Sequence, residues 1–217
     1  TLAIDERVRA RIAAGERIVH LGFGEAGLPV PEAVREELAR AAGANAYGPV
    51  AGSAAAREAA AGYLSRRRLE TRPGQVVFAP GSKALLFALI SALPGDLVLP
   101  QPSWVSYAAQ AALAGKRVWR VPVTAEAGGV PDPAALDELL RSGDARPGIL
   151  LVTSPDNPTG TVAPAGLGRE VAEVADRHGL VVIADEIYRD LSYEPGDYTS
   201  FAELLPGSTY VTNGLSK

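Results

Sequence analysis

The sequence has 217 residues, and its 21 Lys and Arg against 25 Asp and Glu give a formal net charge of −4 at pH 7. This balance implies no polybasic surface for nucleic acid. The hydrophobic share of 47% is typical of a globular chain with a core. With no Cys and only two His, neither a structural zinc site nor a disulfide scaffold can be assembled, so we expect no metal site.

No stretch of the sequence is long and apolar enough to cross a bilayer. The longest candidate, residues 84–93, is about half of what a span requires, and no leader pattern opens the sequence. We therefore expect a soluble, cytoplasmic protein without a membrane partner. The sequence starts without Met and stops at Lys217, directly after a predicted strand, so we expect both ends to be incomplete.

The first third of the chain is predicted to be helical. Apolar residues at helical spacing follow two prolines and predict a helix over residues 32–42. A glycine-rich loop covers residues 43–52, and Ser53 then caps an alanine-rich helix that reaches about residue 66.

The rest of the chain alternates short β-rich runs with helical ones. The predicted strands are residues 75–79, 97–99, 117–121, 148–153, 180–184 and 209–212, and the predicted helices are residues 82–93, 104–114, 133–141 and 165–178. Two strands are continuously apolar, as strands covered on both faces must be. The pattern predicts a three-layer α/β/α domain with a mainly parallel central sheet, incomplete at its C-terminus.

Polar motifs follow four of these strands, and ligands of open α/β sheets bind beyond the carboxyl ends of the strands. The four motifs are residues 80–83, 154–160, 185–188 and 213–217. In the first, Gly81, Ser82 and Lys83 open a helix whose free N–H groups suit a phosphate; the alternative is an ordinary helix start with Ser82 near the cap. Walker A and Rossmann spacings are absent, which disfavours a nucleotide.

Asp185 ends a buried strand, where a carboxylate is costly without a positive partner or several donors. The candidate partners are a basic side chain, the protonated ring nitrogen of a bound heterocycle or, least favoured, a metal. The alternative is a helix cap. If Asp185 begins a helical turn, Tyr188 faces the same ligand. Asn157 lies in a turn by any interpretation, yet its amide can hold a ring oxygen, and Trp104 is either a core residue or a platform for a flat ligand.

Together these motifs resemble the fold-type I enzymes that use pyridoxal 5'-phosphate (PLP), and most closely the class I aminotransferases similar to bacterial aspartate aminotransferases. The resemblance is carried by residues 21–25, 47–49, 81–83, 100–107, 154–160, 184–188 and 216–217. It implies that residues 1–45 are an N-terminal segment with part of a small domain, and that residues 46–217 are the PLP-binding large domain without the C-terminal small domain.

The resemblance also implies a role for each matching residue. Lys217 corresponds to the lysine that forms the Schiff base with PLP and shuttles the proton, and Asp185 to the partner of the pyridine nitrogen. The remaining cofactor contacts implied are Asn157 and Tyr188 to the phenolic oxygen of the ring, Trp104 stacked on the ring, Gly81, Ser82 and Lys83 to the phosphate, and Tyr47 to the phosphate in the neighbouring subunit. Gly24 corresponds to a backbone contact to the substrate α-carboxylate.

The implied activity is amino-group transfer between an amino acid and an α-keto acid, in a homodimer with shared active sites. A fold-type I lyase acting on a β-carbon–sulfur bond and a non-catalytic PLP-binding regulatory module are the alternatives. Lys83 corresponds in some aspartate-type relatives to the group that reaches a distal substrate carboxylate. Two departures stand out: Gly214 replaces a phosphate-binding serine, and the family's later arginines lie beyond Lys217, so the substrate site is not complete within the sequence.

Overall fold

The computed structural model describes residues 2–20, 27–143, 147–193 and 198–215. These residues form two compact units, one within Thr1–Ala46 and the other within Tyr47–Leu215. The assignment of residues 1–45 and 46–217 to a small-domain portion and a cofactor-binding domain stays a prediction.

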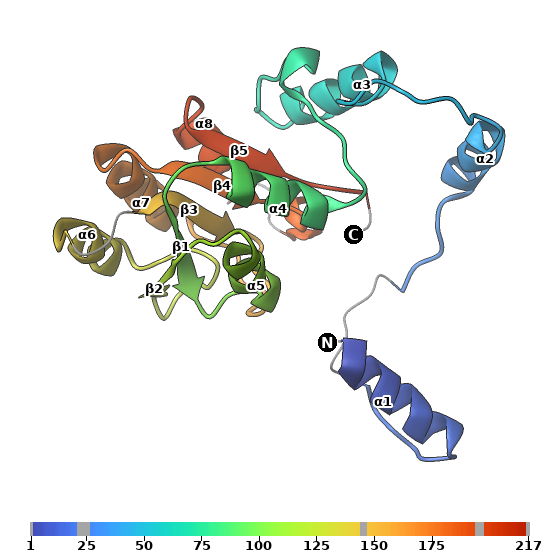
Figure 1. The fold of residues 1–217 in the computed structure, drawn as a ribbon, viewed down its shortest axis with the longest axis horizontal. Helices are drawn as coiled ribbons and strands as arrows, with labels where there is room; N and C mark the ends of the chain where they lie inside the picture. Colours follow the sequence, from blue (N-terminus) through green and yellow to red (C-terminus); the bar gives the residue numbers. More distant parts are fainter. Residues whose placement is uncertain (1, 21–26, 144–146, 194–197, 216–217) are drawn as a thin grey trace. The chain divides into compact units, whose positions relative to one another are not determined.

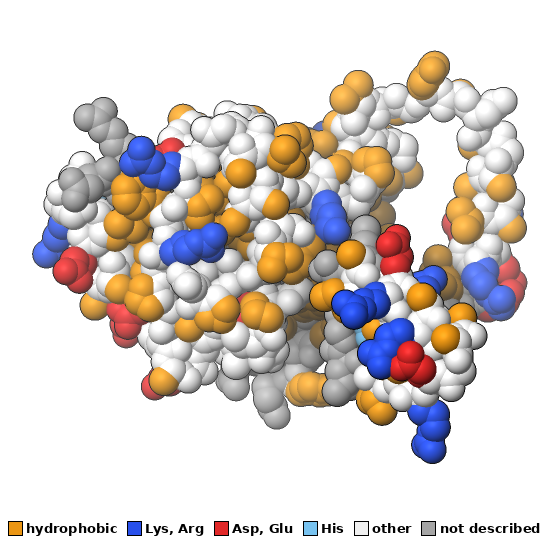
Figure 2. All heavy atoms as spheres, turned by 60° about the horizontal axis from the view of Figure 1, so that its bottom comes forward, with side chains coloured by type: hydrophobic (Ala, Val, Ile, Leu, Met, Phe, Trp, Pro, Cys, Tyr) orange, Lys and Arg blue, Asp and Glu red, His pale blue; other side chains and the backbone are white. Residues whose placement is uncertain are grey.

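The first unit contains two helices, α1 (Leu2–Ala13) and α2 (Glu32–Ala41). Helix α2 was expected from the sequence, whereas α1 was not. The pairs Arg9–Asp5 and Arg11–Glu16 join side chains of α1 and its end at 2.8 and 2.5 Å. Figure 2 shows one face of the molecule, on which basic and acidic side chains are interspersed.

From α4 (Ser82–Ala92) on, the second unit has the helices and strands that the sequence predicts, together with the short helix α8 (Phe201–Leu204), which the sequence did not predict. Its elements are α3 (Ala54–Ser65), the 3-10 turn η1 (Pro73–Gln75), α4 (Ser82–Ala92), β1 (Asp96–Gln101), α5 (Val105–Leu113), β2 (Val118–Pro122), α6 (Pro133–Arg141), β3 (Pro147–Thr153), α7 (Ala165–Arg177), β4 (Val181–Asp185), the 3-10 turn η2 (Arg189–Leu191), α8 (Phe201–Leu204) and β5 (Thr209–Thr212). In the part of the chain that the structure describes, no helix is long and apolar enough to cross a membrane.

The strands form one sheet in the order β2-β1-β3-β4-β5, and every neighbouring pair is parallel (Figure 1). Alternating strand residues face opposite sides. Ile149, Leu151 and Ile183 pack with α4 and α5, whereas Leu150 and Val182 pack with α6, α7 and α8. Both faces are therefore covered by helices, and the expected three-layer α/β/α arrangement is confirmed.

Local sequence signals explain where several elements begin. The Ser53 Oγ accepts a hydrogen bond from the Ala56 N–H at 3.2 Å and caps α3. Asp132 caps α6 in the same way, accepting from the Ala135 N–H at 2.9 Å, and Pro133 supplies a preset φ at the first helical position.

The strand predicted over residues 75–79 is not part of the sheet. Gln75 ends η1, and residues 76–79 run without a strand partner among the described residues; the Phe78 N–H donates instead to the Ala51 carbonyl at 3.0 Å. The β-rich composition favours extended backbone, but a strand also needs a neighbouring strand whose backbone N–H and C=O groups are free to pair with it. The motif at Gly81 therefore follows an extended segment and not a strand.

Candidate functional site

The register of the sheet aligns the ends of three adjacent strands. Asp185 at the end of β4 lies opposite Thr153 of β3 on one side and Thr212 of β5 on the other. Asp185 follows Ile183 by two residues, so its side chain lies on the face covered by α4 and α5. The three side chains thus form a polar row at the carboxyl edge of an apolar sheet.

The Asp185 carboxylate is only 3% exposed and is held by neutral donors. Its Oδ2 accepts from the Tyr107 hydroxyl at 2.7 Å, and its Oδ1 accepts from the Thr212 hydroxyl at 3.1 Å. A longer contact of 3.4 Å runs from the Ile187 N–H to Oδ1. Because the following 3-10 turn begins only at Arg189, with Tyr188 as its N-cap, Asp185 is not a helix cap.

The electrostatic surroundings of this carboxylate favour a cationic ligand. Burial raises the pKa of Asp185, and the hydrogen bonds from Tyr107 and Thr212 oppose the rise without cancelling it. Among the described residues, no Lys, Arg or His forms an ion pair with Asp185. A protonated ring nitrogen fits this place, since it supplies both the missing charge and a donor.

Tyr107 is the main site residue that the sequence interpretation left without a role. It lies on α5, is 2% exposed, and its hydroxyl contacts both Asp185 and the Thr153 hydroxyl, the latter at 2.9 Å. Burial, followed by the negative charge of Asp185, raises the pKa of its phenol, so the phenol stays protonated and donates. A signal was available: Tyr107 follows Trp104 by three residues, which places both on one side of a helix start.

Trp104 packs against the core, and its role as a platform for a flat ligand stays a prediction. It is the N-cap residue of α5, lies half-buried against the core cluster between the sheet and α4–α5, and meets the Tyr107 ring edge-on at a centroid distance of 5.2 Å. The Lys83 Nζ lies 5.2 Å from the centroid of the Trp104 ring. The structure thus brings Lys83, from the motif over residues 80–83, close to Trp104.

The start of α4 leaves its first backbone N–H groups available. Gly81 is the N-cap residue with φ of 87°, a left-handed conformation that favours glycine, and no side chain caps the helix. Ser82 is the first helical residue and is half-buried. Uncapped N–H groups at the positive end of an 11-residue helix suit an anion such as phosphate.

Asn157 and Tyr188 also lie together, because the Asn157 Nδ2 donates to the Tyr188 hydroxyl at 3.5 Å. The loop that carries Asn157 is fixed by Asp156, whose Oδ2 accepts from the N–H and hydroxyl of Thr159 at 3.1 and 2.6 Å. Gly129 allows a close approach behind this loop, since a Cβ there would lie 1.9 Å from the Thr153 carbonyl oxygen. The amide of Asn157 is therefore presented by a rigid loop.

The candidates that remain are Tyr47, Gly24 and Lys217. Tyr47 is fully exposed, and Gly24 and Lys217 lie outside the described residues. Gly214 is exposed, and its N–H donates to the Asn213 Oδ1 at 2.7 Å. Within the described parts of the chain, no group of three His, Cys, Asp or Glu side chains can hold a metal ion.

Comparison with known proteins decides the family. The model of the family described as aminotransferase class I and II matches residues 16–217. The chain belongs to this family. The resemblance inferred from the motifs is therefore confirmed, and the family's solved structures share the fold described above.

Relatives in this family match the chain from end to end. A probable aspartate/prephenate aminotransferase of Thermus aquaticus is 37% identical, and an aspartate aminotransferase of Geobacillus stearothermophilus is 33% identical. The structure of the Thermus thermophilus aspartate aminotransferase with maleate is 34% identical, with a TM-score of 0.90. All three comparisons cover 100% of this chain and 57% of the relative, so the chain spans little more than half the length of these proteins.

Proposed function

We propose that this protein is a PLP-dependent aminotransferase that moves an amino group between an amino acid and an α-keto acid. The observation that carries the proposal is the buried carboxylate of Asp185, held by hydroxyl donors and without a cationic partner among the described residues, in a chain of the aminotransferase family. PLP brings a pyridine nitrogen to such a carboxylate and, when bound, withdraws electrons from the Cα of an attached amino acid.

Each residue of the site has a separate task in this proposal. Asp185 keeps the ring nitrogen protonated, and Tyr107 and Thr212 orient its two oxygens. Asn157 and Tyr188 hold the phenolic oxygen of the ring. These five side chains lie on strand ends, one helix and loops held by hydrogen bonds, so they meet the cofactor with little rearrangement.

The phosphate and the face of the ring are assigned to α4 and α5. The uncapped start of α4 at Gly81 and Ser82 binds the phosphate dianion, and Trp104 stacks on the ring. Lys83, 5.2 Å from the Trp104 ring centroid, is placed to serve either the phosphate or a distal carboxylate of the substrate. The names of the relatives, which include aspartate, favour a dicarboxylic substrate.

Lys217 is proposed as the residue that attaches the cofactor and moves the proton between the substrate Cα and the cofactor. Gly24 is proposed as a backbone contact to the substrate α-carboxylate. Tyr47 is proposed to reach the cofactor phosphate of a neighbouring subunit, which agrees with its full exposure in a single chain. The protein is accordingly proposed to be a homodimer with shared sites.

The proposal is tested on the purified full-length gene product. We expect visible absorbance from bound PLP, and borohydride reduction followed by peptide mapping should place the cofactor on Lys217. Amino acids should be converted in many turnovers only when an α-keto acid acceptor is present, and without one each site should react once. Release of pyruvate and ammonia without an acceptor would point to the lyase, and Lys217→Ala with full transamination would contradict the proposal.

Shared sites have a direct test by subunit mixing. Tyr47→Phe and Lys217→Ala proteins are each expected to be impaired. In a mixed dimer one site collects both changes and the other has none, so activity should return on mixing. Confirmed subunit exchange without recovered activity would contradict a shared site.

A further inference from the structure

The end of α3 carries two side chains that stack on each other. Tyr63 lies in the last turn of α3 and Arg67 follows the helix by two residues. The guanidinium carbon of Arg67 lies 3.7 Å from the centroid of the Tyr63 ring, within the range of a cation–π contact. The pair therefore presents a phenol and a guanidinium side by side.

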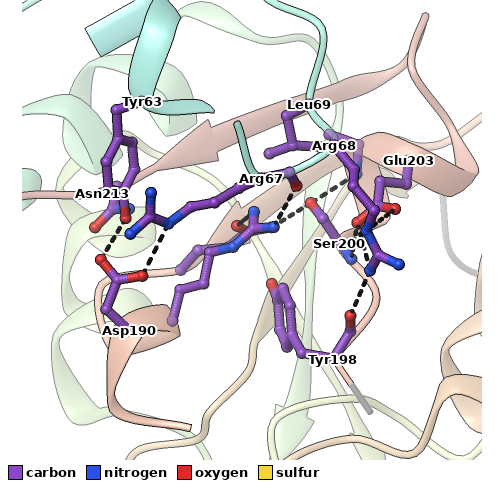
Figure 3. Close-up of polar contacts among 12 residues, drawn as sticks. Tyr63, Arg67, Arg68, Leu69, Asp190, Tyr198, Ser200, Glu203 and Asn213 are labelled. Atoms are coloured by element: carbon purple, nitrogen blue, oxygen red, sulfur yellow. Dashed lines mark hydrogen bonds and ion pairs between the residues drawn. The ribbon is translucent and has the colours of Figure 1, made fainter. Parts of the chain in front are cut away.

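Both groups bind the same carboxylate in η2. The Tyr63 hydroxyl donates to the Asp190 Oδ2 at 2.6 Å, and the Arg67 Nε donates to Oδ1 at 3.0 Å (Figure 3). The preceding residue is held as well, because the Arg189 Nη2 donates to the Arg67 carbonyl oxygen at 2.9 Å. Two successive residues of η2, directly after Tyr188, are thus fixed to one end of α3.

The charges make this attachment strong. Burial acts to raise the pKa of Asp190, but the hydrogen bonds from Tyr63 and Arg67 outweigh it and hold the pKa below its ordinary value. Burial, followed by the hydrogen bond to Asp190, raises the pKa of the Tyr63 phenol. The donor is therefore protonated and the acceptor is ionised near neutral pH, which gives a charge-assisted bond.

The Tyr63 hydroxyl also contacts the chain after β5. It accepts a hydrogen bond from the Asn213 Nδ2 at 3.4 Å, and Asn213 is four residues before Lys217 in the sequence (Figure 3). One oxygen atom thus touches the loop that carries Tyr188 and the segment that leads to Lys217. These contacts join residues 127 and 150 positions apart.

We propose that Tyr63, acting through Asp190, is a positioning residue that holds Tyr188 in register with the segment leading to Lys217. The inference rests on the proposed function, because it assigns Tyr188 to the phenolic oxygen of PLP. Neither Tyr63 nor Asp190 is assigned a contact with the cofactor or the substrate. Their effect reaches the cofactor only through the placement of Tyr188.

The test is the Tyr63→Phe variant of the full-length gene product, which removes the hydroxyl and keeps the ring beneath Arg67. A misplaced Tyr188 stabilises the anionic phenolic oxygen less. We therefore expect the pH midpoint of the visible absorbance change of bound PLP to rise by about 0.5 to 1 unit, the value of roughly one hydrogen bond. Asp190→Asn should shift the midpoint in the same direction and serves as the second variant.

The route through Tyr188 is tested by a double-mutant cycle. In a Tyr188→Phe background, Tyr63→Phe should add no further shift. Tyr193 provides a matched control, because it lies on the same loop and is fully exposed, and Tyr193→Phe should leave the midpoint unchanged.

The outcomes separate the two proposals. If the unsubstituted protein shows no visible absorbance with PLP, the proposed function fails. If it does, but Tyr63→Phe and Asp190→Asn keep the original midpoint, or the same shift persists in the Tyr188→Phe background, the positioning role of Tyr63 is overturned. Thermal unfolding of each variant without PLP confirms that it is folded.

Discussion

Asp185 and Glu186 are adjacent carboxylates, 3% and 1% exposed, with partners of different kinds. Glu186 forms an ion pair with the Arg189 Nη1 at 2.8 Å and accepts a hydrogen bond from the Ser200 hydroxyl. Within the ranges that the structure describes, Asp185 has hydroxyl and N–H donors only. Burial raises the pKa of both carboxyl groups, so desolvation disfavours the charged form of each, although their surroundings differ.

The alternation of an extended chain explains the difference. Successive side chains point to opposite faces, so Asp185 meets Tyr107 of α5, while Glu186 meets Ser200 just before α8. Glu186 continues the extended run, since its N–H donates to the Thr212 carbonyl at 2.9 Å. On the Glu186 face the chain supplies its own cation, whereas on the Asp185 face the described residues supply only neutral donors that orient the carboxylate.

This contrast distinguishes a structural carboxylate from a functional one. A buried charge that the chain neutralises itself is part of the fold, whereas one left without a cation is suited to a ligand that brings one. Matched carboxylate-to-amide substitutions at the two positions should therefore have opposite signatures.

The largest expected effect is the loss of activity in Asp185→Asn. Without the carboxylate, the ring nitrogen of PLP loses a buried ionic partner, and kcat/KM for transamination should fall by about 100- to 1000-fold. The stability of the protein without PLP should not fall, because an uncompensated buried charge is removed. Steady-state kinetics and thermal unfolding of the same preparations measure both, and an unchanged kcat/KM would contradict the assignment of Asp185.

Glu186→Gln should show the reverse pattern. The substitution leaves the Arg189 guanidinium, 8% exposed, without its carboxylate, so the free energy of unfolding should fall by about 3 kcal/mol. Denaturant unfolding without PLP measures this loss, with Asp185→Asn as the matched control. Equal stability of the two variants would remove the distinction between the carboxylates.

Tyr107→Phe should have an intermediate effect. The change removes a hydrogen bond to a buried carboxylate, which is worth about 1.5 kcal/mol, so kcat/KM should fall by about 10-fold. Because that hydrogen bond lowers the pKa of Asp185, its loss lets the pKa rise further. The pH below which PLP binding weakens, which is the acid limb of the affinity profile, should therefore rise. A limb that stays in place would show that Tyr107 does not tune Asp185.

The smallest expected effect is on the pH dependence of stability without PLP. The pKa of Asp185 is raised in the folded state, so the unfolded chain releases its proton at lower pH. The folded state therefore loses stability as pH rises above 3.8, the ordinary pKa of the group. Asp185→Asn should therefore gain stability relative to the unsubstituted protein between about pH 4 and pH 7. Urea unfolding at several pH values tests the sign, and a relative loss over this range would contradict it.

Local signals in the sequence were enough for much of the fold. Asp132 followed by Pro133 fixed the start of α6, and Ser53 fixed the start of α3, because a cap is formed by residues a few positions apart. The segment over residues 75–79 failed as a strand because pairing depends on a neighbour that lies elsewhere in the chain.

In the candidate site, too, local features could be predicted from the sequence and contacts between distant residues could not. The apolar run before Asp185 predicted a buried carboxylate, which the structure shows, and Asn157 and Tyr188, both taken from motifs that follow strands, contact each other. The partner Tyr107 is 78 positions from Asp185, and Thr212 is 27 positions away. Only the strand register and the packing of α5 bring these hydroxyls to one carboxylate. Local spacing could place Tyr107 beside Trp104, but it could not join either hydroxyl to Asp185.

The most direct test of the account is the protonation state of the cofactor nitrogen, measured by NMR with PLP labelled with ¹⁵N in the ring. At pH 8 the nitrogen should carry a proton in the unsubstituted protein and in Glu186→Gln, and should lose it in Asp185→Asn. That result would show that Asp185 is the carboxylate kept for a cation from outside the chain. An unprotonated nitrogen in the unsubstituted protein, or one that stays protonated in Asp185→Asn, would contradict it.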